Sequence, residues 1–116
     1  MNKFQKISIA KEARIELHDA LNLTGAEISI NKMPADTSVP FIHSHKQNEE
    51  IYGILKGHGT ILLDGEEMEL KAGDWLRVSP AVKRQLSTTP DSAMTYLCIQ
   101  VKSNSLEQWT MTDAIV

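Results

Sequence analysis

The sequence predicts an all-β protein, and two observations support this prediction. Short apolar or alternating segments recur at close spacing along the 116 residues and are separated by turn-forming residues. Two of these segments flank Asp64-Gly65, a residue pair that supplies the positive φ angles of a two-residue hairpin. Because many short, closely spaced strands are typical of sandwiches and barrels, we expect an antiparallel β-sandwich or β-barrel.

The expected strands follow one another between residues 26 and 101. The first, Ala26–Met33, comes after Gly25 and ends at a connector that contains two prolines. The later expected strands lie, in order, in the segments IYGILK (51–56), GTILL (59–63), EEMEL (66–70), DWLRVSP (74–80) and AMTYLCIQV (93–101).

The two ends of the chain show weaker patterns. Residues 12–25 fit either a short helix or a strand followed by a turn, with Gly25 as the terminator. In the tail, the order of residues from Ser105 to Trp109 fits a short helix. We therefore expect one domain over residues 1–116, with a core of about residues 26–101 and short extensions at both ends.

Composition and charge indicate an ordinary globular protein, with 41% hydrophobic and 23% charged residues. The net charge is -3, and the sequence has no basic patch that would bind the phosphates of nucleic acid. Nucleic acid is therefore not an expected partner. The apolar runs are too short for a membrane span or a signal peptide, so we expect a cytoplasmic protein with no membrane partner. The one cysteine, Cys98, lies in an apolar run and is interpreted as a small buried side chain rather than a nucleophile.

The segment from Val39 to Gly59 concentrates imidazole and carboxylate groups. His43 and His45 are two residues apart, so on a strand they project from the same face, about 6.6–6.8 Å apart. Glu50 follows a short connector and can point back from the next strand. Two neutral imidazoles and one carboxylate suit Zn, Fe, Ni, Mn or Co and leave coordination positions open. An H-x-H pair alone also occurs as surface histidines or hydrogen-bonded strand histidines.

Strand parity selects one of the two adjacent glutamates. Glu50 and Tyr52 share one face of the expected strand, whereas Glu49 and Ile51 share the other. We therefore expect only Glu50 to belong to the site. Tyr52 is expected beside it, either as a residue that lines the pocket or as a core aromatic with a hydrogen-bonded hydroxyl.

This segment resembles the first motif of the cupin superfamily. That motif consists of a glycine, five residues, H-x-H, three or four residues, a glutamate, six residues and a glycine. Here residues 43–45 match the H-x-H, Glu50 follows after four residues, and Gly57 follows after six more. Thr37 stands where the family has its first glycine.

The second cupin motif is similar but degraded, and it is recognisable mainly from its opening, Gly73-Asp74. Ser79 stands where the family has proline. Arg84 falls at the position of the family's fourth ligand, a histidine. Arginine is permanently charged and cannot coordinate a cation, so the fourth ligand is left open.

The resemblance implies an antiparallel cupin β-barrel, or double-stranded jelly roll, with a pocket in its mouth and a homodimeric assembly. It also implies metal ligands at His43, His45 and Glu50. The implied cofactor is one divalent transition metal, which is Zn, Fe, Ni or Mn.

Several interpretations of Arg84 are open. In the one we favour, Arg84 faces the pocket beside a three-ligand metal and binds a substrate carboxylate or phosphate through two hydrogen bonds. In the second, it pairs with Glu50 and the site holds no metal. In the third, the register shifts, so that Arg84 points to solvent and Gln85 faces inward. A surface arginine beside Lys83 is the alternative without a functional role.

Other residues of the pattern carry weaker predictions. Phe41 shares parity with His43 and is expected to wall the pocket or simply to pack. His58 lies between two glycines and is expected in a tight connection at a barrel end, which makes it a weak ligand candidate. Trp75 and Trp109 are expected in core or dimer packing.

Three functions are compatible with these residues. The first is a metal-dependent enzyme, since two histidines and a carboxylate suit oxygen chemistry or Lewis-acid catalysis. The second is a non-enzymatic sensor or carrier with a metal-free pocket, and the third is a decayed site on a dimer scaffold. We favour a small metal-binding cupin that binds or acts on a small anionic molecule, with no catalytic residue assigned. The expected substrate-binding residues are Phe41, Tyr52, Arg84 and Gln85.

Overall fold

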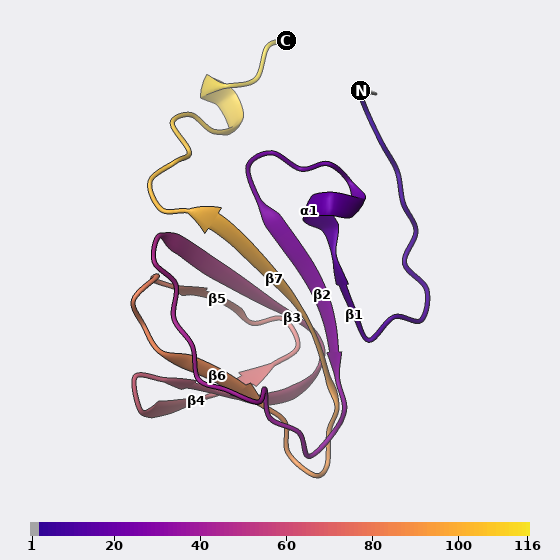
Figure 1. Cartoon of the computed structure of the whole chain (residues 1–116), viewed down its shortest axis with the longest axis vertical. Helices are drawn as coiled ribbons and strands as arrows, with labels where there is room; N and C mark the ends of the chain where they lie inside the picture. Colours follow the sequence, from indigo (N-terminus) through magenta and orange to yellow (C-terminus); the bar gives the residue numbers. More distant parts are fainter. Residues whose placement is uncertain (1–2) are drawn as a thin grey trace.

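The computed structural model describes residues 3–116, which form seven strands, one short α-helix and one 3-10 turn (Figure 1). The elements, in chain order, are β1 (Arg14–Glu16), α1 (Leu17–Ala20), β2 (Glu27–Met33), β3 (Asn48–Leu63), β4 (Glu66–Lys71), β5 (Trp75–Val78), β6 (Arg84–Ser87), β7 (Met94–Lys102) and η1 (Thr110–Thr112). Every strand pairing is antiparallel. The predicted all-β class is confirmed.

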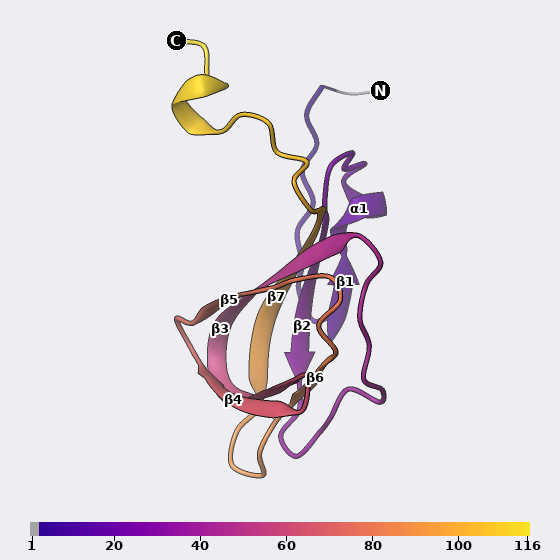
Figure 2. The same cartoon turned by 90° about the vertical axis from the view of Figure 1, so that its left-hand side faces the viewer.

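Strand β3 organises the fold because it pairs with four other strands. Residues 48–57 pair with β7 on one side, and residues 50–53 pair with β5 on the other. Residues 58–63 pair with β4 on one side, and residues 60–63 pair with β6 on the other. A register shift between Ile54 and Lys56 marks a bulge, which bends a strand. Figure 2 shows β3 curving between the two groups of strands.

The two groups form the walls of the barrel. The main sheet contains β1, β2, β7, the first part of β3, and β5. The short sheet contains β4, the second part of β3, and β6. The connector before β3 extends the short sheet, because Ser38 bridges to Ser87 and His43 bridges to Arg84. The H-x-H segment therefore lies beside the short sheet, while Glu50 lies on the main sheet.

The hydrophobic core fills the space between the two sheets. β3 and β7 contribute residues at alternate positions, as the period of two in a half-buried strand requires, and β2, β4, β5 and β6 contribute one residue each. On β3, Glu50, Tyr52 and Ile54 are buried, whereas Glu49 and Ile51, on the opposite face, are half-buried. The predicted parity is confirmed. The core residues are Met33, Tyr52, Ile54, Ile61, Leu70, Val78, Leu86, Met94, Tyr96 and Cys98.

The predicted hairpin is confirmed. Leu63 pairs with Glu66 across a loop of two residues. In this loop Asp64 has a φ angle of 48° and Gly65 a φ angle of 86°. Two successive positive φ angles define the type of turn whose twist matches the flanking strands.

Three local expectations differ from the structure. The tight connection at His58 is wrong, because this residue lies inside β3 and pairs with Lys71. The tail turns at Thr110–Thr112 and not between Ser105 and Trp109. Strand β6 was not expected, since RQLS is too short to show a period of its own. Residues 12–25 contain both a strand and a helical turn, which the pattern had offered as alternatives.

The two tryptophans are not part of the core of this chain. Trp75 is 60% exposed and Trp109 is 62% exposed. Within residues 3–116, no helix has the length and apolar character that crossing a membrane requires.

We predict that Gly57→Ala destabilises the protein more than Gly65→Ala does. Both glycines have positive φ angles, 74° and 86°, which cost an L-residue about 1–2 kcal/mol. A Cβ at Gly57 would also collide with the backbone carbonyl oxygen of Ala93, whereas a Cβ at Gly65 meets no described atom within 4 Å. Urea denaturation of the two variants tests this, and equal losses of unfolding free energy would contradict it.

Candidate metal centre

The three predicted ligands come from two separate parts of the chain that the fold brings together. The H-x-H segment is held in place by its backbone. His43 exchanges two backbone hydrogen bonds with Arg84, at 3.1 and 2.9 Å, and the His45 N–H donates to the carbonyl of Pro80 at 2.8 Å. Glu50 is held by the ladder of β3, opposite Val78 on β5 and Gln100 on β7.

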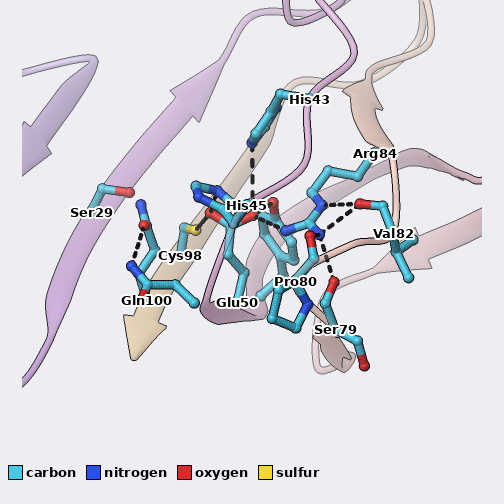
Figure 3. Close-up of polar contacts among 12 residues, drawn as sticks. Ser29, His43, His45, Glu50, Ser79, Pro80, Val82, Arg84, Cys98 and Gln100 are labelled. Atoms are coloured by element: carbon cyan, nitrogen blue, oxygen red, sulfur yellow. Dashed lines mark hydrogen bonds and ion pairs between the residues drawn. The ribbon is translucent and has the colours of Figure 1, made fainter. Parts of the chain in front are cut away.

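The side chains of His43, His45 and Glu50 converge on one point. One potential ligand atom from each of them lies within 4.8 Å of the other two. His45 Nε2 is 3.2 Å from Glu50 Oε2, and His43 Nε2 is 3.8 Å from Oε1 (Figure 3). The structure thus places the three residues as a metal-binding cluster requires.

The carboxylate of Glu50 is almost fully buried and is strongly hydrogen-bonded. Its Oε1 accepts hydrogen bonds from the Tyr52 hydroxyl at 2.6 Å and from Arg84 Nη1 at 2.7 Å. Among residues 3–116, its Oε2 accepts one hydrogen bond, from a weak donor, the Cys98 thiol, at 3.2 Å. Oε2 is therefore the oxygen that has a lone pair left for a cation.

The protonation states at the site suit metal binding. Burial raises the pKa of Glu50, but the hydrogen bonds from Tyr52, Arg84 and Cys98 outweigh it, and the net pKa lies below its usual value. Burial lowers the pKa of His43, more than the nearby Glu50 raises it. A metal binds an ionised carboxylate and a neutral imidazole, and these pKa directions favour the ionised form of Glu50 and the neutral form of His43.

Two nitrogen atoms at the site have no hydrogen-bond partner in the part of the chain that the structure describes. They are His43 Nδ1 and His45 Nε2, both fully buried. His45 Nε2 lies 3.2 Å from Glu50 Oε2, within ion-pair distance, but does not make a hydrogen bond with it. A buried imidazole nitrogen without a partner is costly, and a metal ion between the nitrogen and the oxygen would satisfy both atoms. The residues present therefore fit a divalent transition metal.

Arg84 is fully buried, with an exposed fraction of 0%, and its guanidinium is directed into the protein. Besides Glu50, it donates to the backbone carbonyls of Ser79, Pro80 and Val82 at 2.7 to 3.0 Å. The contact with Glu50 is the one described by the second interpretation. The third interpretation and the surface alternative are wrong, because Arg84 does not reach solvent.

These contacts count against the interpretation favoured from the sequence, in which Arg84 binds a substrate anion through two hydrogen bonds. A bidentate clamp on a substrate anion needs two parallel N–H donors, and only one Nη1 proton of Arg84 is left without a partner among residues 3–116. Arg84 lines the cavity, but its guanidinium is already hydrogen-bonded to Glu50 and to backbone carbonyls.

A cavity of about 380 Å³ opens beside the cluster, and it holds two of the other expected residues. Tyr52 is buried at its base, and Phe41, which is 61% exposed, lies at its rim against the ring of His43. Gln85 lies outside it, because its amide donates to the carbonyl of Val39 at 2.7 Å. The lining residues are Arg14, Ser29, Asn31, Val39, Phe41, His43, His45, Glu50, Tyr52, Arg84, Leu86, Tyr96, Cys98 and Gln100.

Sequence reasoning missed the polar wall of this cavity. Arg14, Ser29, Asn31 and Gln100 lie on β1, β2 and β7, far from the histidine motif in the chain. A signal was present in β2, where Ser29 and Asn31 alternate with Ile28 and Ile30. Polar residues at alternate positions of a strand are usually exposed, but here they are the buried ones, at 3% and 5% exposure.

Comparison with known proteins agrees with the fold. The chain belongs to the cupin family, since the Cupin domain model matches residues 30–100. The crystal structure of a cupin protein from Bacteroides fragilis is similar along the entire chain. It has 63% sequence identity and a TM-score of 0.96, and the match covers 100% of this chain and 98% of that one.

More distant relatives match part of this chain. A predicted oxalate decarboxylase from Thermotoga maritima has 27% identity and a TM-score of 0.61, over 65% of this chain and 64% of that one. An uncharacterised protein of Methanocaldococcus jannaschii is 34% identical over 61 residues, which are 53% of this chain. The chain thus matches about half the length of that curated relative, 49%.

We predict that Arg84→Met destabilises the metal-free protein by about 3–5 kcal/mol, because it leaves the Glu50 carboxylate buried without its cation. The double variant Arg84→Met/Glu50→Gln is expected to lose less stability than the sum of the two single variants. Urea denaturation of chelator-treated proteins measures this coupling. Additive losses would show that the two side chains do not depend on each other.

Proposed function

We propose that this protein binds one divalent transition metal through His43, His45 and Glu50, and a small anionic molecule in the adjoining cavity. The observation that carries the proposal is an unsatisfied imidazole nitrogen beside a buried carboxylate at the centre of the site. His45 Nε2 has no hydrogen-bond partner among residues 3–116, and it lies 3.2 Å from Oε2, the oxygen of Glu50 with the weaker hydrogen bond. Zn, Fe, Ni and Mn all accept this set of donors.

The surrounding residues prepare the three ligands. Tyr52 and Arg84 hold Oε1 of Glu50 and thereby fix the direction of Oε2. Burial raises the pKa of Tyr52, so its hydroxyl stays protonated and acts as a donor, not as a base. A bound metal would supply a Lewis acid with open positions at the floor of the cavity.

The charges at the site support an anionic ligand. Among the residues that line the cavity, Glu50 is the one acidic side chain, and Arg84 already neutralises it. Arg14 and a divalent metal would both add positive charge to the cavity. The similar chain from Thermotoga maritima is described as a predicted oxalate decarboxylase, and oxalate is a small anion.

A second candidate function is a metal-free binding pocket in a sensor or carrier. The observation that favours it is the ion pair between Arg84 Nη1 and Glu50 Oε1, at 2.7 Å, in which both side chains are almost fully buried. An arginine beside the carboxylate supplies a positive charge of the kind that a metal would otherwise provide. Metal analysis separates the two candidates.

We expect about one transition metal per chain in untagged protein and at least a tenfold loss in His45→Ala, because this variant removes one of three ligands. His58→Ala is the matched control, since His58 is exposed and lies outside the cavity. Mass spectrometry of the metal content measures the result. Absence of metal from the unmodified protein after reconstitution with each candidate ion would favour the metal-free pocket.

We also propose a homodimer in which a second copy covers the C-terminal tail. Figures 1 and 2 show this tail leaving the barrel at the same end as the N-terminal segment. Leu106, Trp109 and Met111 are 71%, 62% and 84% exposed, and such a group of large apolar side chains marks an interaction site. The tail begins directly after β7, so its partner would lie beside the main sheet.

Light scattering during size exclusion tests the dimer. We expect a mass of twice the 13.0 kDa chain for the unmodified protein and a shift to the single-chain mass for Trp109→Ser/Met111→Ser. Met68→Ser is the control, because Met68 is an exposed apolar residue on β4, remote from the tail in sequence. Equal masses for the unmodified protein and the tail variant would contradict this role for the tail.

A further inference from the structure

The cavity extends from Glu50 across the main sheet to its edge strand β1. Residues directly opposite each other in antiparallel strands share a face, so the register identifies rows of side chains on the inner face. Tyr52 pairs with Cys98, which pairs with Ser29. In the next row, Tyr96 pairs with Asn31, and Asn31 pairs with Arg14. Side chains from both rows line the cavity.

Three of these side chains form a hydrogen-bonded chain at the far wall. Arg14 Nη1 donates to Asn31 Oδ1 at 2.5 Å, and Asn31 Nδ2 donates to Ser29 Oγ at 3.0 Å. Asn31 and Ser29 are almost fully buried, at 5% and 3% exposure, whereas the Arg14 side chain is 55% exposed. Figure 3 shows Ser29 on the opposite side of Glu50 from Arg84. The Asn31 side chain is therefore fixed in one orientation by a cation at its oxygen.

This far wall has more hydrogen-bond donors than its own contacts use. Arginine has five N–H donors, and Arg14 uses one on Asn31 and one on Glu16, at 3.1 Å. The second Nδ2 proton of Asn31 and the hydroxyl proton of Ser29 have no side-chain acceptor among residues 3–116. The Glu16 carboxylate is 58% exposed, and such surface pairs are weak, so it competes poorly for Arg14.

The far wall also carries charge that the cavity does not balance. Arg84 and Glu50 form a pair at one end, which leaves Arg14 as the remaining charged lining residue. Surplus donors beside a fixed positive charge, on a partly desolvated surface, are what recognition of carboxylate or phosphate oxygens requires. The far wall thus offers hydrogen-bond donors and a positive charge to anionic oxygens, apart from the metal ligands at the other end of the cavity.

We propose that Arg14, Asn31 and Ser29 form a second anion subsite, and that the ligand is an elongated small molecule with an acidic group at each end. One acidic group faces the metal site formed by His43, His45 and Glu50, and the other faces Arg14. This inference rests on the proposed function of the metal cluster. It transfers the role of anion recognition, which the sequence had suggested for Arg84, to an arginine on the edge strand.

The fold sets the length of the ligand. Ser29 lies on β2, two strands away from Glu50 on β3, and Arg14 lies one strand further. Neighbouring strands are about 4.8 Å apart, so the two subsites are separated by roughly 10–14 Å between strand axes. The side chains reach toward each other across part of this distance. A diacid with several intervening carbons spans more of this distance than a dianion with adjacent carboxylates, so we expect the longer diacids to bind better.

Calorimetric titration of the metal-loaded protein with straight-chain diacids from succinate to suberate tests this proposal, with monoacids of equal length beside them. We expect the best diacid to bind about tenfold or more tightly than the monoacid of equal length, because one additional charge-assisted hydrogen bond supplies a factor of this size. In Arg14→Gln this preference should disappear, because the variant loses much more affinity for the diacid than for the monoacid, while the metal content stays unchanged. Arg14→Lys should keep part of it, because it retains the charge and loses the planar fork.

Arg77→Gln is the matched control, since Arg77 is an exposed arginine on β5 that does not line this cavity. Equal affinity for diacids and monoacids in the unmodified protein, or a preference that survives Arg14→Gln, would overturn the second subsite. Metal content without binding of any acid would overturn the proposed anionic ligand and this subsite together. Loss of metal from the unmodified protein would instead point to failure of the metal centre alone.

A phosphonocarboxylate of the same length identifies the group that the far wall prefers. Tighter binding than the diacid, lost in Arg14→Gln, would support the subsite and assign a phosphate-like terminal group. Weaker binding, with the diacid preference intact, would support the subsite and assign a carboxylate.

Discussion

The buried ion pair between Glu50 and Arg84 is the interaction on which the rest of the site depends. Glu50 on β3 belongs to the main sheet, and Arg84 on β6 belongs to the short sheet, so the pair joins the two walls of the barrel. Each member makes the burial of the other possible, because a single buried charge would be strongly destabilising. The same guanidinium satisfies the backbone carbonyls of Ser79, Pro80 and Val82, and so it also fixes the turn before β6.

This pair has two opposing effects on a metal ion. The positive charge of Arg84 keeps Glu50 ionised and holds one of its oxygens, which prepares the carboxylate as a ligand. The same charge repels a cation and replaces the histidine that the cupin pattern places at this position. We therefore expect weaker metal binding than in a cupin with four ligands, together with a stronger attraction for anions. The further positive charge of Arg14 acts in the same direction.

The bend of β3 separates the two walls of the barrel. Before the bend, β3 carries Glu50 and Tyr52 in the main sheet, and after it the strand supports β4 and β6. Because β1, β2 and β7 continue the main sheet beyond Glu50, the polar side chains of these strands face the same cavity as the metal cluster. A site that the sequence shows as one short motif is thus one end of a longer binding surface.

The sequence alone determined the features that depend on local chemistry. Asp64-Gly65 fixed the hairpin because few other pairs adopt two positive φ angles, and strand parity chose Glu50 over Glu49. The spacing of residues 43–50 and their resemblance to the cupin motif identified the cluster. Only the tertiary structure decided the role of Arg84, because its charge could be balanced by Glu50, by a ligand or by solvent. Only the fold brought Arg14, Ser29 and Asn31 to the cavity, since the pairing of β1, β2 and β7 joins residues that are far apart in the chain.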